Sequence, residues 1–185
     1  MLYYLRGVKR NQQPEAIRTH WKGFSALTYD VVDCTMENIL TSEGLALLAR
    51  QICRVRACGI VLMAPVCSSW SWMSRFSTQR SIIEPLGNET SESVAAGNLM
   101  VSRMVLLMSL IVARGSIFII EQPQGSIMLQ HPRFQHFIKH NIVWKVLLGE
   151  PATCALASLT CALQPSSLRR YASEAYLLSK ISVGT

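Results

Sequence analysis

Runs of apolar residues separated by polar segments predict strands and helices that alternate along the chain. The uninterrupted apolar runs at 59–64 and 116–120 are typical of strands that are buried on both faces of a sheet. The apolar segment between them, 98–114, is long enough for a buried helix, and its methionines recur at helical spacing as core residues. The other predicted elements are strands at 2–5, 25–32 and 141–148 and helices at 14–22, 41–56 (capped by Thr41 or Ser42), 132–140 and 166–180.

This alternation of strand and helix predicts the fold class. It indicates an α/β protein, a Rossmann-like three-layer domain with a mostly parallel sheet and helices on its faces. We expect the domain to span 1–150, with 151–185 as a C-terminal extension that is helical or packs on the same domain. Ligands of such sheets bind beyond the carboxyl ends of the strands, so residues that follow a strand are the first candidates for a site.

Two predicted strand ends carry reactive side chains. The first buried run is followed by APVCSSWSW, which contains Cys67, and the second by EQP, which begins at Glu121 and which we expect to form a turn. Adjacent strands lie about 5 Å apart, so Cys67 and Glu121 would share one crevice if these strands are neighbours. A thiol and a carboxyl so placed can act as nucleophile and acid on an electron-poor ring. The alternatives are a cysteine that packs as a small hydrophobe and a carboxylate that is only the first exposed residue after its strand.

The segment 65–97 is predicted to be a long loop, because it is rich in Ser, Thr and Glu. Trp70 and Trp72 alternate there, as in an extended stretch with both indoles on one side. They can stack on bases or adenine, or they can pin the loop to the core. Arg75 and Arg80 either contact phosphates or lie on a solvated surface.

The succession of a buried strand, a Pro-x-Cys loop, a helix, a strand and a Glu-x-Pro turn resembles the middle of cytosine carbon-5 DNA methyltransferases. Pro65-Val66-Cys67 and Glu121-Gln122-Pro123 carry the resemblance, which covers roughly 25–150. It implies that Cys67 attacks carbon 6 of a flipped cytosine while Glu121 holds and protonates ring nitrogen 3. It also implies S-adenosylmethionine as methyl donor and DNA as partner. The further contact residues that we assign are Asp30 and Pro65 for the cofactor and Ser68, Ser69, Trp70, Arg75, Gln122 and Pro123 for the substrate.

The segments expected to bind the cofactor depart from that family. The family carries a Phe-x-Gly-x-Gly loop after its first strand, whereas this chain offers Arg6-Gly7 alone, and Val66 replaces the second proline before the cysteine. No clear Gln-Arg-x-Arg element follows Glu150. Asp30 ends a predicted strand and either accepts hydrogen bonds from ribose hydroxyls or is a solvated loop residue.

These departures leave three hypotheses open. The first is a divergent methyltransferase-like domain that is either active or inactive. The second is a non-catalytic, degenerate Rossmann-like module that binds nucleic acid or protein. The third is a cysteine hydrolase, which requires His131 close to Cys67.

Composition narrows the class of protein further. The chain has 185 residues, 50% of them hydrophobic and 16% charged, which predicts a globular domain with a large core rather than disorder. The net charge of +7 suits a polyanion such as DNA, and the scattered basic residues suit a solvated surface equally well. Six cysteines without a CxxC pair predict reduced thiols in an intracellular protein and no metal site. We expect no leader peptide, and no membrane span because Arg103 and Arg114 interrupt the apolar segment.

Overall fold

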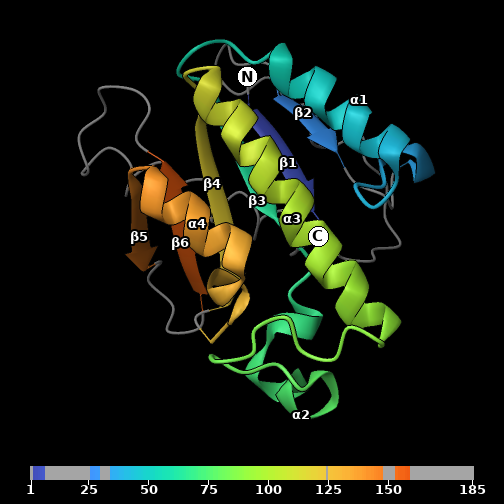
Figure 1. The fold of residues 1–185 in the computed structure, drawn as a ribbon. Coiled ribbons are helices and arrows are strands. Elements are labelled where there is room, and N and C mark those ends of the chain that lie inside the picture. Colours follow the sequence, from blue (N-terminus) through green and yellow to red (C-terminus); the bar gives the residue numbers. More distant parts are fainter. Residues whose placement is uncertain (1, 7–25, 30–33, 124, 148–152, 159–185) are drawn as a thin grey trace, which may run out of the picture.

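A computed structural model describes residues 2–6, 26–29, 34–123, 125–147 and 153–158 of the chain. They form an α/β arrangement around one six-stranded sheet with the strand order β2-β1-β3-β4-β6-β5 (Figure 1). The strands are β1 (Leu2–Arg6), β2 (Ala26–Tyr29), β3 (Ile60–Ala64), β4 (Ile117–Pro123), β5 (Val143–Leu147) and β6 (Thr153–Ser158). The predicted helices at 14–22 and 166–180 lie outside the described residues.

The sheet has a parallel part and an antiparallel edge. β1 pairs in parallel with β2 and β3, and β3 pairs in parallel with β4. β6 lies between β4 and β5 and is antiparallel to both. The sequence does not predict β6, because TCALAS has little of the β-branched and aromatic character that marks a strand. Its pairing makes this part of the 151–185 extension a member of the same sheet.

Three helices lie side by side over one face of the sheet (Figure 1). The long helix α3 (Glu92–Ala113) lies between α1 (Ser42–Cys53) and α4 (Pro132–His140) and contacts both. The hydroxyl of Thr41 caps α1 as predicted, by accepting a hydrogen bond from the backbone N–H of Gly44 at 3.0 Å. α4 begins and ends at the predicted residues, with proline in its first turn.

Helix α3 begins earlier than the sequence predicts, at Glu92 rather than at 98. Its first turn is polar and therefore resembles a loop in sequence, although an acidic residue there is favourable beside the positive end of the helix dipole. The preceding residues, 65–91, are called the β3–α3 segment below. They are not a structureless loop but contain three short helices beyond the end of β3 (Figure 1), namely η3 (Ser68–Trp70), η4 (Trp72–Ser74) and α2 (Arg75–Thr78).

Among the described helices, α3 is long and apolar enough to cross a bilayer, judged by length and composition only. In this fold half of its most apolar window is buried. Arg103 on α3 donates hydrogen bonds of 2.7 Å to the backbone carbonyls of Ile39 and Thr41. α3 therefore packs here as a core helix followed by a strand, as predicted.

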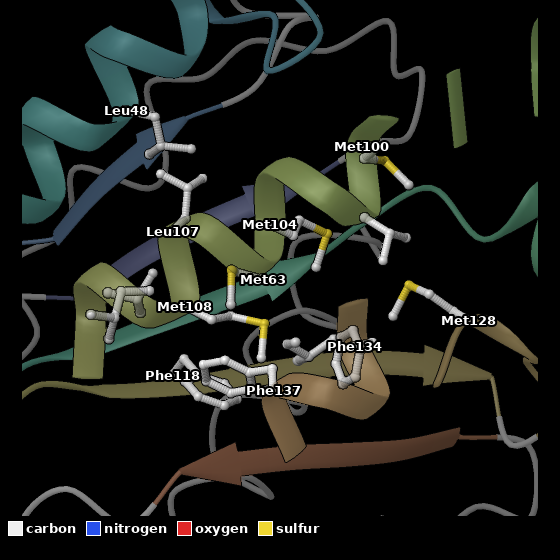
Figure 2. Packing of buried hydrophobic residues seen from close by; sticks show 14 of the residues in the cluster. Leu48, Met63, Met100, Met104, Leu107, Met108, Phe118, Met128, Phe134 and Phe137 are labelled. Atoms are coloured by element: carbon white, nitrogen blue, oxygen red, sulfur yellow. The ribbon is translucent and has the colours of Figure 1, made fainter. Parts of the chain in front are cut away.

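The helices and the sheet share one core that is rich in methionine and phenylalanine. In Figure 2 the side chains of Met104 and Met108 on α3 lie among those of Met63, Phe118 and Phe134, and all five are buried. Unbranched methionine fills irregular gaps between elements, and each such burial stabilises the fold by roughly 1.5–3 kcal/mol. The prediction that the methionines of this helix are core residues is confirmed.

The central strands are buried on both faces, as their apolar runs predict. Met63 of β3 and Phe118 of β4 belong to the core below the helices. Leu62 and Ile119 point to the opposite side, because successive side chains alternate along a strand, and they are buried as well. Both sides of the sheet are therefore covered at these two strands.

Candidate functional site

Cys67 lies in a tight turn just beyond the carboxyl end of β3. The backbone N–H of Trp70 donates a hydrogen bond of 2.9 Å to the carbonyl of Cys67, which closes the single turn of η3. Cys67 is a free cysteine, and its side chain is half-buried. Its thiol is thus held at the edge of the sheet where ligands of α/β proteins bind.

Glu121 lies inside β4, which corrects the expected turn at Glu121-Gln122-Pro123. The strand continues to Pro123 because β6 pairs with this stretch, with Glu121 opposite Ala155. The sequence predicts a turn here because it gives no sign of β6, the strand that pairs with this stretch. The Glu121 side chain is half-buried at the same edge of the sheet as the Cys67 turn.

β3 and β4 are adjacent and parallel, which confirms the neighbourhood on which the pairing of the two side chains depends. Met63 and Ile120 are partners in the register, so Glu121 follows one residue beyond. Burial raises the pKa of the Cys67 thiol most strongly, the negative charge of Glu121 raises it further, and a backbone hydrogen bond at Cys67 lowers it. The structure therefore brings the thiol and the carboxylate close enough to interact electrostatically.

A buried amide ties the two strand ends together. The side chain of Gln122 donates a hydrogen bond of 3.1 Å to the carbonyl of Pro65 and accepts one of 3.0 Å from the hydroxyl of Ser126. Both the nitrogen and the oxygen of this side-chain amide therefore make hydrogen bonds within the protein. The Gln122 side chain, an expected substrate contact, is buried in this structure.

The two tryptophans do not share a side, which corrects the expected extended stretch. Trp70 is completely buried, whereas Trp72 is 69% exposed. The chain from 68 to 74 forms 3-10 turns, in which residues two apart do not project in the same direction. Trp70 pins the turn to the core, as one of the two alternatives states, and so neither it nor the buried Ser69 offers a surface to substrate.

Arg80 is buried, so it can neither reach a phosphate nor belong to a solvated surface. Its side chain is only 2% exposed, and its guanidinium carbon lies 3.5 Å from the centre of a Trp70 ring. Arg75, in α2, remains partly exposed. Ser68 is exposed and Pro123 is partly exposed, and together with Arg75 they are the predicted substrate contacts that stay accessible.

The β3–α3 segment also carries exposed apolar side chains that the sequence does not mark as a group. Phe76 is 98% and Ile83 is 95% exposed, and Trp72, Met73 and Ile82 are exposed as well. Trp72, Met73 and Phe76 have the spacing of one helix face, which would ordinarily predict burial rather than exposure. All five belong to the segment that follows Cys67 along the chain.

His131 does not pair with Cys67. The imidazole Nδ1 accepts a hydrogen bond of 3.3 Å from the backbone N–H of Arg133 and so caps α4. Its ring meets the indole of Trp70 edge-on, with 6.0 Å between ring centres and an angle of 72°. Among the described residues, burial, a backbone hydrogen bond and Glu121 are what shift the pKa of the Cys67 thiol. The cysteine hydrolase hypothesis loses its base.

Other predicted residues lie partly outside the described part of the chain. Asp30 and Gly7 are among the residues that the structure does not describe. The carbonyl of Pro65, the other assigned cofactor contact, receives the Gln122 hydrogen bond.

Cys58 is disulfide-bonded, so the expectation that all cysteines are reduced thiols is wrong for this residue, whereas Cys34 and Cys53 are free. The described residues hold no cluster of three metal-ligating side chains.

Comparisons with known proteins give no relative. No family model, no curated protein and no solved structure matches the chain.

Proposed function

We propose that this chain is a divergent S-adenosylmethionine-dependent methyltransferase-like domain of the cytosine carbon-5 DNA type, with a Rossmann-like three-layer fold. The observation that carries the proposal is the interaction of the Cys67 thiol with the Glu121 carboxylate at adjacent parallel strand ends. Nucleophile and ring-protonating acid must approach one flat ring together, which this placement allows.

The sheet order supports the same reading. The chain goes from β1 outward to β2 and then returns to β3 on the other side of β1. The point where the strand order reverses therefore falls between β1 and β3, and doubly wound sheets bind their ligands at such a point. The burial of Leu62 and Ile119 on the face away from the helices supports a third layer.

The chemistry follows from the two side chains. The Cys67 thiolate forms a bond to carbon 6 of cytosine, the ring gains electron density, and the Glu121 carboxyl donates a proton to ring nitrogen 3. S-adenosylmethionine, when bound, supplies the methyl group that carbon 5 takes up. Loss of the carbon 5 proton to water, expulsion of the thiolate and return of the nitrogen 3 proton to the Glu121 carboxylate would then restore the ring and free Cys67. The reactive form is a thiolate beside a protonated carboxyl, so one proton that moves from Cys67 toward Glu121 meets both needs.

The fit of the cofactor rests on few described residues. Pro65 is one of two assigned contacts, and its carbonyl already accepts the Gln122 amide. The proposal therefore gives the cofactor no contact of known geometry and assigns only the roles of Cys67 and Glu121.

Transfer of a labelled methyl group from S-adenosylmethionine to cytosine-containing DNA tests the proposal. We expect Cys67→Ser and Glu121→Gln to lose incorporation and Cys53→Ser, which alters an exposed free cysteine on α1, to keep it. Equal incorporation by wild type and Cys67→Ser would refute the nucleophile.

The second candidate is a non-catalytic module that binds a protein or nucleic acid. The five exposed apolar side chains of the β3–α3 segment favour it, because large apolar side chains gathered in one exposed segment are typical of interaction sites. Calorimetry with S-adenosylhomocysteine separates the two candidates. Micromolar binding counts against the module, and the absence of binding favours it.

A further inference from the structure

A stack of three side chains fixes the turn that carries Cys67. Trp70 is its central member, with the guanidinium of Arg80 over its face and the ring of His131 against its edge. The backbone of Trp70 is held too, because its carbonyl accepts a hydrogen bond of 3.0 Å from the N–H of Ile127. Through its own N–H, Trp70 then holds the carbonyl of Cys67. The thiol is therefore connected to the stack by one short turn of backbone.

Arg80 is itself anchored by partners far from it in sequence. One terminal nitrogen donates to the carbonyl of Pro85 at 2.6 Å and to the side-chain oxygen of Asn98 at 2.8 Å. The other donates to the carbonyl of Val94 at 3.0 Å. Val94 and Asn98 belong to the first turns of α3. The guanidinium is thus hydrogen-bonded to α3 and at the same time packs against the indole of Trp70.

The side chain of Asn98 is fixed in turn. It donates hydrogen bonds of 3.1 Å to the carbonyl of Leu86 and 2.9 Å to a carboxylate oxygen of Glu89. These bonds connect the end of the β3–α3 segment with α3. A planar guanidinium suits this position, because it can stack on a ring and donate in its own plane at once.

Gly97 shows how closely α3 approaches the stack. A Cβ atom on this residue would lie 2.7 Å from the hydroxyl of Ser69, 3.1 Å from a terminal nitrogen of Arg80 and 3.4 Å from the indole nitrogen of Trp70. Only a residue without a side chain fits there. The start of α3, Arg80 and the Cys67 turn therefore form one continuous packed unit.

We propose that Arg80 is a positioning residue for the Cys67 turn, which it holds through the face of Trp70 so that the thiol stays beside Glu121. Arg80 does not touch the reacting atoms. It acts indirectly, because its hydrogen bonds fix it to α3 and its packing on Trp70 holds the indole, and with it the turn, in place. This inference rests on the proposed function for its biological meaning, since it concerns the same thiol and carboxyl, but it is tested without cofactor or DNA.

The test measures how fast iodoacetamide alkylates each free cysteine of the full chain between about pH 6 and about pH 10, a range that brackets ordinary thiol titration. Peptide mass spectrometry assigns the rate to Cys67, and Cys53 is the internal reference because it is exposed. We expect Arg80→Met to speed alkylation of Cys67 about tenfold near neutral pH and to move its profile toward lower pH, with Cys53 unchanged. Arg80→Lys keeps the cation without the planar fork, and we expect it to restore part of the wild-type profile.

Two comparisons separate positioning from general loss of structure. Arg75→Met changes an arginine of the same segment outside the stack, and we expect it to leave the Cys67 profile unchanged. Glu121→Gln is measured in both backgrounds. It shifts the Cys67 profile in the wild type, and this shift should vanish beside Arg80→Met, because the thiol no longer lies next to the carboxylate.

An Arg80→Met protein with the wild-type Cys67 profile, or with an undiminished effect of Glu121→Gln, overturns the inference. If Arg80→Met does not fold by circular dichroism, Trp70→Phe takes its place with the same outcomes, because phenylalanine keeps a ring but binds a cation less well. Methyl transfer does not enter these measurements. A chain with the expected thiol behaviour and no methyl transfer would refute the proposed function and leave the positioning role intact.

Discussion

The titration of His131 gives a sharp test of the packing around the Cys67 turn. Burial, together with the positive charges of Arg80 and Arg133, lowers the pKa of this imidazole from 6.5 to about 4, against an opposing effect of Glu89. The neutral ring is the form that caps α4, since Nδ1 accepts the hydrogen bond from Arg133. Protonation of His131 in the folded protein is therefore costly.

The sign and the size of the effect on stability follow from linkage. Between about pH 6.5 and about pH 4 the unfolded chain binds a proton at His131 that the folded chain does not. The free energy of unfolding therefore falls as the pH falls through this window and levels off below it. A difference of about 2.5 pKa units, at about 1.4 kcal/mol per unit, gives at most about 3.5 kcal/mol well below pH 4.

The assay is urea unfolding across this range for the wild type and for His131→Asn. Asparagine cannot titrate here, and its side-chain oxygen is a good helix cap, so the variant isolates the charge. We expect the stability difference between the two proteins to shift in favour of the variant by up to about 3 kcal/mol from pH 7 to pH 4. His136→Asn, which makes the same substitution at an exposed position of the same helix, is the matched control. Parallel curves for wild type and His131→Asn would refute the reasoning.

Three further predictions concern the same region. Trp70→Ala should cost about 3–5 kcal/mol of unfolding free energy in urea titrations and Trp72→Ala less than about 0.5 kcal/mol, and equal costs would contradict the contrast in burial. Gly97→Ala should lower stability by about 1–3 kcal/mol despite the better helix propensity of alanine, and a rise in melting temperature would show that the approach of α3 is looser than described. Glu121→Gln should lower the pKa of the Cys67 thiol and speed its alkylation near pH 8, and an unchanged rate would separate the two side chains.

The elements that the sequence predicts well are those with a strong local signal. The short apolar runs at 59–64 and 116–120 predict buried strands and are strands, and Pro132 marks the start of α4. The placement of Cys67 and Glu121 follows from these runs, because each residue comes at or just beyond the end of its apolar stretch. Local sequence was thus enough to find the pair once the two strands were taken as neighbours.

The features that escape prediction depend on distant partners. β6 is a strand because it pairs with β4 and β5, and the sequence TCALAS carries no local signal for a strand. Arg80 is buried because backbone carbonyls and a side-chain amide, 5 to 18 residues away along the chain, accept the hydrogen bonds that water would otherwise accept. An arginine in a polar loop is normally solvated. Whether each tryptophan is buried or exposed depends on the 3-10 turns that carry them. The alternation of serine and tryptophan in the sequence instead suggests an extended strand.

The position of β6 has a consequence for the order in which the protein is completed. Among the described strands, β5 joins the sheet only through β6, and β6 also pairs with the outer side of β4, although β6 comes last of the three along the chain. Until the ribosome has released residues 153–158, the growing chain exposes one unpaired edge at β4 and a fifth strand with nowhere to pair. An open, apolar strand edge invites pairing with other chains. Synthesis that stalls just before Thr153 would therefore yield an aggregation-prone product, although every other described element has already been made.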